Sequence, residues 1–80
     1  GKFKNLIFEF EADYSRDIKT IEALRSLKKE EAVESITLAV SDDTKRMVNF
    51  MMFAKQHEMK KGLKSTFKDL SEWKKTRKYN

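Results

Sequence analysis

The stretch that decides the fold is Met47-Val-Asn-Phe-Met-Met-Phe-Ala54, near the middle of an 80-residue chain. At about 100° per residue, its apolar side chains cover most of the circumference of a helix and leave only a narrow polar stripe. A helix of this kind needs cover on more than one side. The pattern therefore predicts a central helix over residues 44–60 that packs against the other elements and against a second copy of the chain.

A strand is predicted at the start of the chain. Residues 3–12 alternate with period two, with Leu6, Phe8 and Phe10 on one face and more polar side chains on the other. Aromatic residues and an isoleucine add strand propensity. We expect a half-buried strand whose apolar face is covered by the central helix.

An amphipathic helix is predicted next, over residues 15–28. Apolar side chains recur there at three-residue steps from Ile18 to Leu27, which is typical of one buried stripe on a helix. Asp13 and Ser15 are both suitable N-cap residues, because each can accept a hydrogen bond from a backbone N–H of the first turn.

Residues 32–40 fit two structures. As a strand, they alternate Ile36, Leu38 and Val40 with small or hydroxylated side chains; as a helix, they would also gather apolar side chains on one side. The β-branched residues favour the strand. Ser41-Asp-Asp43 follows, and we interpret it as the cap of the central helix, since carboxylates are favoured at a helix N-terminus and no third metal ligand lies nearby in the sequence.

Near the end of the chain, the spacing of apolar residues predicts a last helix over residues 63–77. This helix lies within a basic segment that extends to residue 78. Gly62 suits the position where the central helix stops, although a single bent helix through it is an alternative. Four apolar residues follow at helical spacing, and four lysines gather on one flank. The apolar residues are Leu63, Phe67, Leu70 and Trp73, and the lysines are Lys64, Lys68, Lys75 and Lys78.

The charge of the chain is unevenly distributed. The formal net charge is +5. Residues 1–54 contain nine Lys and Arg against ten Asp and Glu, whereas residues 55–80 contain nine against three. The basic character therefore belongs to the C-terminal segment, which suits an acidic partner such as nucleic acid or an acidic protein.

The sequence contains no pattern that indicates an enzyme. Cysteine is absent, His57 is the only histidine, and the two glycines stand at positions 1 and 62, so neither a nucleophile–base arrangement nor a phosphate-binding loop is suggested. His57 fits a partly exposed helix position better than a base or metal ligand. We expect no catalytic residues, no metal site and no cofactor.

These elements predict one α+β domain over residues 1–80, in the order strand, helix, strand, helix, helix, rich in helix and dimeric. No run of apolar residues approaches the length of a membrane span, and no apolar signal-peptide segment begins the chain. We expect a cytoplasmic protein without membrane contact.

The predicted function is a non-enzymatic, protein-binding regulatory module. Its partner would be a second copy of the chain or another protein, and the alternative is a nucleic-acid binder that contacts phosphate through its C-terminal lysines. The predicted protein interface consists of Met47, Phe50, Met51, Met52, Phe53, Leu70 and Trp73. The predicted nucleic-acid contacts are Lys64, Lys68, Lys75 and Lys78.

Two segments resemble known families. Residues 6–40, with Ala23-Leu-Arg-Ser-Leu27 and Val33-Glu-Ser-Ile-Thr-Leu38, are similar to the β-α-β opening of small bacterial antitoxin-like proteins. This resemblance implies a helical tail that binds a toxin. Leu27-Lys-Lys-Glu-Glu-Ala-Val-Glu-Ser-Ile36 resembles the start of the second helix of ribbon-helix-helix repressors, which implies an intertwined dimer whose paired strands enter the major groove of DNA.

Overall fold

Strands and helices alternate along the whole described chain. The computed structural model describes residues 4–59 and 63–76. The elements, in order, are β1 (Asn5–Glu9), α1 (Tyr14–Arg25), β2 (Ser35–Val40), α2 (Asp42–Glu58), β3 (Lys64–Asp69) and α3 (Leu70–Thr76). The predicted mixture of helices and strands is therefore confirmed.

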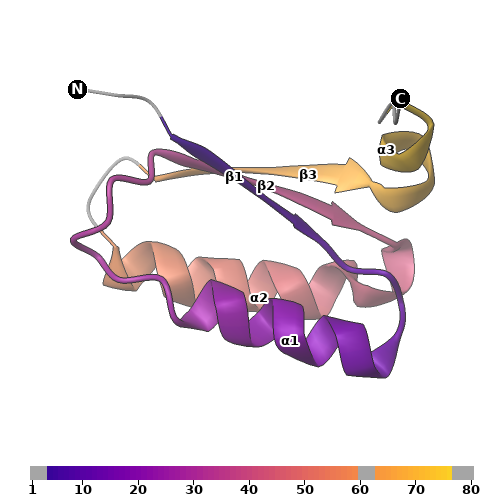
Figure 1. Ribbon diagram of the computed structural model, residues 1–80, viewed down its shortest axis with the longest axis horizontal. Helices are drawn as coiled ribbons and strands as arrows, with labels where there is room; N and C mark the ends of the chain where they lie inside the picture. The colour runs from indigo at the N-terminus through magenta and orange to yellow at the C-terminus, as the bar shows by residue number, and fades with distance from the viewer. Residues whose placement is uncertain (1–3, 60–62, 77–80) are drawn as a thin grey trace.

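The three strands form one parallel sheet in the order β1-β2-β3. Figure 1 shows α1 and α2 together beneath this sheet, and α3 at its far end on the other side. Both crossover helices lie on the same face because each connection moves one strand further in the same direction and turns with the same hand. The molecule thus has a helical layer under one sheet face and a largely open outer face.

The register of the strands assigns each side chain to a face. Leu6, Ile36 and Ser65 lie side by side, as do Phe8, Leu38 and Phe67 two residues further on. These rows point into the helical layer, where they meet Leu24 of α1 and Val48 and Met52 of α2. The neighbouring rows, such as Ile7, Thr37 and Thr66, belong to the outer face.

The predicted strand and helix of the N-terminal half are both present, and their first and last residues differ from the predicted ones. The strand predicted over residues 3–12 contains β1, and its Phe10 is fully buried. The helix predicted over residues 15–28 contains most of α1. Asp13 is the N-cap residue, and its carboxylate accepts a hydrogen bond from the Arg16 N–H at 3.2 Å.

In the middle of the chain, the structure also agrees with the prediction from the sequence. Residues 35–40 form a strand rather than a helix, and Ser41 is the N-cap residue of α2. The packing partner differs from the expectation, because α2 lies mainly against β2, whereas α1 lies against β1. The central helix is thus displaced by one strand from the predicted position, since β2 is the middle strand.

The prediction of a helix over residues 63–77 is wrong for its first half. Residues 64–69 form β3, and only Leu70–Thr76 are helical. Lys64, Thr66 and Lys68 alternate with Ser65 and Phe67, and this period of two matches the pleat of β2. The sheet therefore has a third strand from the same chain, where the sequence predicted only two strands. Gly62 and Lys60 lie outside the described residues.

Within residues 4–59 and 63–76, no helix is both long enough and apolar enough to cross a membrane.

Candidate protein-binding surface on helix α2

Helix α2 divides its apolar residues between two environments. Val48 and Met52 point into the core and are almost completely buried. On the opposite side, the exposed fraction is 76% for Phe50, 62% for Phe53 and 46% for Met47. Side chains of this size rarely stay so exposed without a partner, so the outer side of α2 is the leading candidate for a binding surface.

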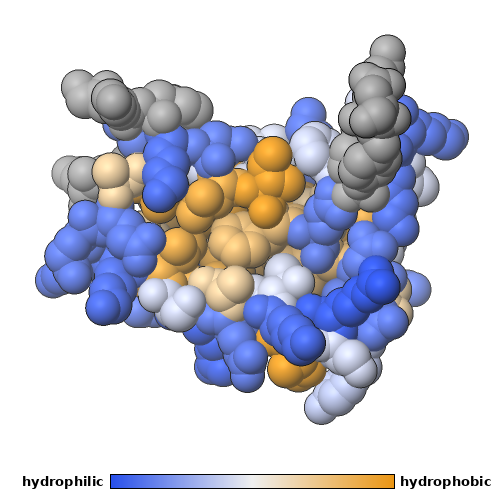
Figure 2. Space-filling model, viewed as in Figure 1, coloured by the Kyte–Doolittle hydropathy of each residue, from blue (hydrophilic) through white to orange (hydrophobic). Residues whose placement is uncertain are grey.

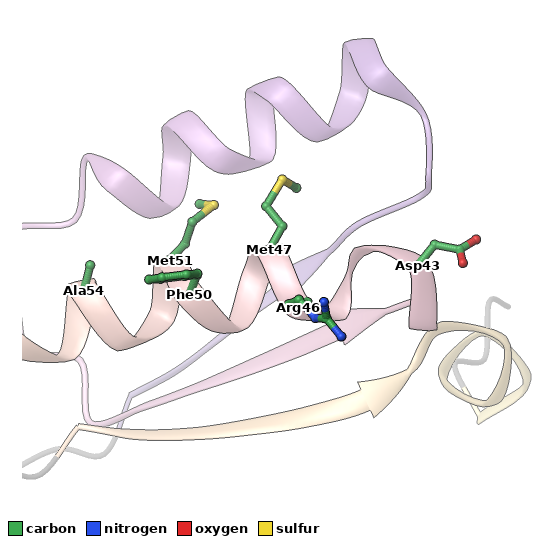
Figure 3. A pocket seen from close by; sticks show the side chains of 6 residues that line it. All are labelled: Asp43, Arg46, Met47, Phe50, Met51 and Ala54. Carbon is green, nitrogen blue, oxygen red and sulfur yellow. The ribbon is translucent and has the colours of Figure 1, made fainter.

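A shallow hollow lies on this outer side. Its volume is about 700 Å³, and the residues that line it are Asp43, Arg46, Met47, Phe50, Met51 and Ala54. Figure 3 shows Met47 and Met51 pointing toward α1, with Phe50 and Ala54 beside them. We refer to Met47, Phe50, Met51, Phe53 and Ala54 as the α2 patch. The hollow is open to solvent, so its shape suits an elongated apolar surface of a partner rather than an enclosed small molecule.

Helix α1 also carries exposed apolar side chains. Tyr14 is highly exposed and Ile18 is partly exposed. They lie one turn apart, on the flank of α1 opposite to Thr20, whose hydroxyl group reaches the Glu9 carbonyl of β1 at 3.4 Å. The helical layer thus has exposed apolar residues on α1 as well as on α2.

Polar groups border the α2 patch. Asp43 and Arg46 carry opposite charges at its N-terminal end. At its C-terminal end, the ring of the exposed His57 meets the ring of Phe53 edge to face, with 4.8 Å between their centroids. His57 thus has the partly exposed position that its sequence context suggested. The apolar centre with a polar border is the arrangement found in protein interfaces.

Lys55 is the residue in this region whose role the sequence did not reveal. Its side chain is only 3% exposed, and its ammonium group donates hydrogen bonds to the carbonyl oxygens of Arg25 at 2.9 Å and Leu27 at 2.8 Å. A cation there also suits the negative end of the dipole of α1. Lys55 follows Val48 by seven residues and Met52 by three, and this helical spacing was the signal for its inward position.

Three of the predicted interface residues make most of their contacts within the domain. Met52 belongs to the core and Leu70 is buried. The half-buried Trp73 donates a hydrogen bond from Nε1 to the Glu9 carboxylate, and the neighbouring Lys74 forms an ion pair with Glu11 at 3.0 Å. These contacts attach α3 to the C-terminal end of β1. Of the predicted interface residues, Met47, Phe50 and Phe53 remain exposed, with Met51 partly exposed beside them.

The lysines predicted to contact nucleic acid do not all lie on one surface. Lys64 and Lys68 are exposed and lie on the outer face of β3, whereas Lys75 lies on α3 and Lys78 lies outside the described residues. Hydrogen bonds from the Ser71 hydroxyl and the Glu72 backbone N–H lower the pKa of the Asp69 carboxyl, and the charge of Lys75 is a minor contribution in the same direction.

Comparisons with protein-family models, with curated proteins and with solved structures find no match for this chain. The resemblances to antitoxin-like proteins and to ribbon-helix-helix repressors therefore stay predictions. In the described part of the chain, no group of three or more His, Cys, Asp or Glu side chains could hold a metal ion.

Proposed function

We propose that this protein is a non-enzymatic, protein-binding regulatory module whose docking surface is the α2 patch. The exposure of Phe50 and Phe53 on a helix whose other side is fully packed carries this proposal. Burying a phenylalanine side chain contributes roughly 1.5–3 kcal/mol. Two such residues next to Met47 supply enough apolar area to anchor a specific partner.

The partner presents the apolar side of an amphipathic helix. The α2 patch runs along the outer side of one helix, so it offers a shallow and elongated apolar surface. Methionine side chains adapt to a varied partner surface, and Ala54 leaves room for a large side chain. The opposite charges of Asp43 and Arg46 at one end give the partner helix a preferred direction.

Photo-cross-linking in the native cell tests this function. A photo-reactive amino acid replaces Phe50 in one variant and Lys19, an exposed polar position of α1, in a control variant. We expect one or a few defined proteins to be cross-linked from position 50 and not from position 19. The captured protein is then purified, and its affinity for the unmodified chain is measured.

Matched substitutions separate binding from folding. Phe50→Asp should abolish the affinity for the captured protein, whereas Asn49→Asp, the same charge one residue earlier on an exposed position, should leave it nearly unchanged. Both variants should keep the circular dichroism spectrum of the parent. Equal affinities for the two variants would contradict the proposal. Cross-linking of position 50 to the chain itself would instead make a second copy the occupant of the α2 patch.

A nucleic-acid function is the second candidate, and the common face of Lys64 and Lys68 on β3 favours it. The two side chains are four residues apart in a strand, or roughly 13 Å. Each phosphate contact makes binding more sensitive to salt. If these lysines bind phosphate, Lys64→Gln with Lys68→Gln should reduce the slope of log affinity against log salt by about 2. Fluorescence anisotropy with labelled single-stranded and duplex oligonucleotides measures this slope.

A further inference from the structure

Exposed residues of α2 recur at a spacing of seven. They form three lines along the outer side of the helix: Asp43, Phe50 and His57 in the centre, Arg46 and Phe53 on one flank, and Met47 and Ala54 on the other. Seven residues correspond to almost two helical turns, so such lines run nearly parallel to the helix axis. Two helices that pack along a common seam use this spacing. The side of α2 that carries these residues faces away from the sheet (Figure 1), where another chain can reach it.

We propose that a second copy of the chain covers the α2 patch while no protein partner is bound, and that the two α2 helices then lie antiparallel about a two-fold axis at Phe50. In this register, Phe50 faces Phe50 of the second copy, and Asp43 faces His57. The two-fold axis produces each unlike contact twice. The role of the second copy as a cover rests on the proposed function, since the protein partner would bind the same residues and displace it.

The side chains on the two flanks suit the same register. A two-fold axis perpendicular to the pair of helices places each flank next to the same flank of the second copy. Arg46 therefore meets Phe53, and its guanidinium group can lie over the ring of that phenylalanine in a cation–π contact. Met47 meets Ala54, whose small side chain leaves space for the flexible methionine.

The polar side chains of the seam are available in the single chain. Within the described part of the chain, neither Asp43 nor Arg46 has an ion pair or a side-chain hydrogen bond. His57 is exposed, and its ring meets Phe53 edge to face. Its imidazole can therefore donate a hydrogen bond to the Asp43 carboxylate of the second copy. Each proposed contact thus joins side chains that are exposed in one chain.

Charge selects the antiparallel direction. If the two helices were parallel, Asp43 would face Asp43 of the second copy, and Arg46 would lie beside Arg46. Like charges in close contact repel, and they discriminate against a wrong arrangement. The antiparallel pair instead brings each charged residue to a residue of a different kind, Asp43 to His57 and Arg46 to Phe53.

A second apolar area on the surface is less suited to a partner. In the view of Figure 1, β1 and α1 lie nearest the reader, and Figure 2 shows apolar surface at the centre of this side, with hydrophilic surface around it. Leu6 and Phe8 of β1 and Ile21 of α1 are partly buried and already packed against the core. Phe50 and Phe53 instead project into solvent, so covering α2 removes more apolar area from water.

The size of the contact indicates a weak dimer. From Asp43 to His57, the central line is about 21 Å long, and a helix with its side chains is about 10–12 Å wide. A contact of this footprint is smaller than the roughly 800 Å² that each partner buries in a standard interface. A protein partner can therefore displace the second copy, because it competes with an interaction of low affinity.

Disulfide trapping tests the pairing, because the chain contains no cysteine. Helix axes about 10 Å apart bring facing Cα atoms to roughly 5–6 Å, within the range that a disulfide spans. Phe50→Cys should therefore form a covalent dimer under mild oxidation. Asn49→Cys is the matched control, since its exposed side chain is turned about 100° away from the central line. We expect cross-linking at position 50 to be at least about tenfold faster.

A mixture of two cysteine variants tests the register. Two copies of Met47→Cys would lie roughly 9 Å apart along the antiparallel helices, and two copies of Ala54→Cys roughly 12 Å apart, whereas position 47 of one copy faces position 54 of the other. An equimolar mixture should therefore cross-link mainly as the mixed dimer, which mass spectrometry distinguishes from the two homodimers. Homodimers as the main products would overturn the antiparallel arrangement.

Light scattering measures the dimer without cysteine. The mass of the parent chain should rise above the 9.5 kDa of one chain as its concentration approaches about 1 mM. Phe50→Asp should stay at 9.5 kDa, and Asn49→Asp should behave as the parent, with circular dichroism as the check on folding. A parent chain that stays at 9.5 kDa throughout would overturn the pairing, and the proposed function would still stand if position 50 captures another protein. A dimer without any captured protein would support the pairing and contradict the proposed function.

Discussion

The two sides of α2 contain the same kinds of residue and lie in opposite environments. Met52 is packed in the core, whereas Met47, five residues earlier, is about half exposed. Lys55 is buried between α1 and α2, whereas Phe53, two residues before it, lies in solvent. Position around the helix, and not residue type, decides which side chain stabilises the domain and which is left for a partner. The inner side should therefore dominate the unfolding free energy and the outer side should dominate binding.

The largest expected effect belongs to the inner side. Met52→Ala should lower the unfolding free energy by about 2–5 kcal/mol, because it leaves a cavity in the core. Met47→Ala is the matched control and should cost less than about 1 kcal/mol. Urea unfolding followed by circular dichroism measures both. Equal costs for the two methionines would show that α2 has no inner and outer side of the kind described.

Lys55→Met should have the next largest effect. The substitution keeps the length of the buried side chain but removes both hydrogen bonds to the carbonyl oxygens of Arg25 and Leu27. We expect the unfolding free energy to fall by roughly 1–3 kcal/mol, since these carbonyls lose their partner at the end of α1. Hydrogen exchange of the last turn of α1 should accelerate as well. An unchanged stability would show that water replaces the ammonium group without cost.

Trp73 lies between the two extremes, because it is half-buried and joins α3 to β1. Trp73→Phe keeps most of the apolar area and removes the hydrogen bond to the Glu9 carboxylate. The expected loss of unfolding free energy is about 1–2 kcal/mol. Thermal unfolding measures it, with Lys75→Gln on the same helix as a control that should change stability by less than about 0.5 kcal/mol. A Trp73→Phe variant as stable as the control would mean that this hydrogen bond contributes little to the attachment of α3.

The smallest effect is expected on the outer side of α2. Phe53→Ala removes an exposed ring that meets the ring of His57 edge to face. The unfolding free energy should change by no more than about 0.5 kcal/mol, because little apolar area is lost from the folded state. The same variant should weaken binding to the protein captured through the α2 patch. A loss of stability comparable to that of Met52→Ala would show that Phe53 belongs to the core and not to the outer side of α2.

Local patterns predicted the first four elements. Periodicity indicated β1, α1 and α2, whereas residues 32–40 fit two structures by spacing and were assigned to a strand by their β-branched residues. Residues 41–43 were interpreted as the cap of α2, and Asp13 was one of two cap candidates for α1, with Ser15. β3 was not predictable in the same way. Leu63, Phe67 and Leu70 fit a helical stripe, but Phe67 also fits a period of two with Ser65. A six-residue segment is too short for periodicity to choose between these structures.

The sequence predicted which residues of α2 are apolar, but it did not predict which side of the helix would face a partner. Met47, Phe50, Met51, Met52 and Phe53 were all expected at an interface, and the structure assigns Met52 to the core. The reason is that an almost wholly apolar helix does not reveal which part of its circumference its own chain will cover. That cover comes from β2 and α1, and the pattern of α2 itself does not show which of its sides these elements will contact.

The sequence by itself determined the local properties of this protein: the strand and helix types of the first four elements, the polar segments that precede α1 and α2, the apolar character of α2 and the basic character of the C-terminal segment. These depend on the spacing of residues within a few turns or a few strand positions. The tertiary structure alone decided the parallel sheet with β3 at its edge, the buried place of Lys55, the division of α2 and the open edge at β1. Each of these depends on contacts between residues far apart in the chain, where the strand that covers a side chain, or leaves it exposed, is chosen by packing of the whole domain.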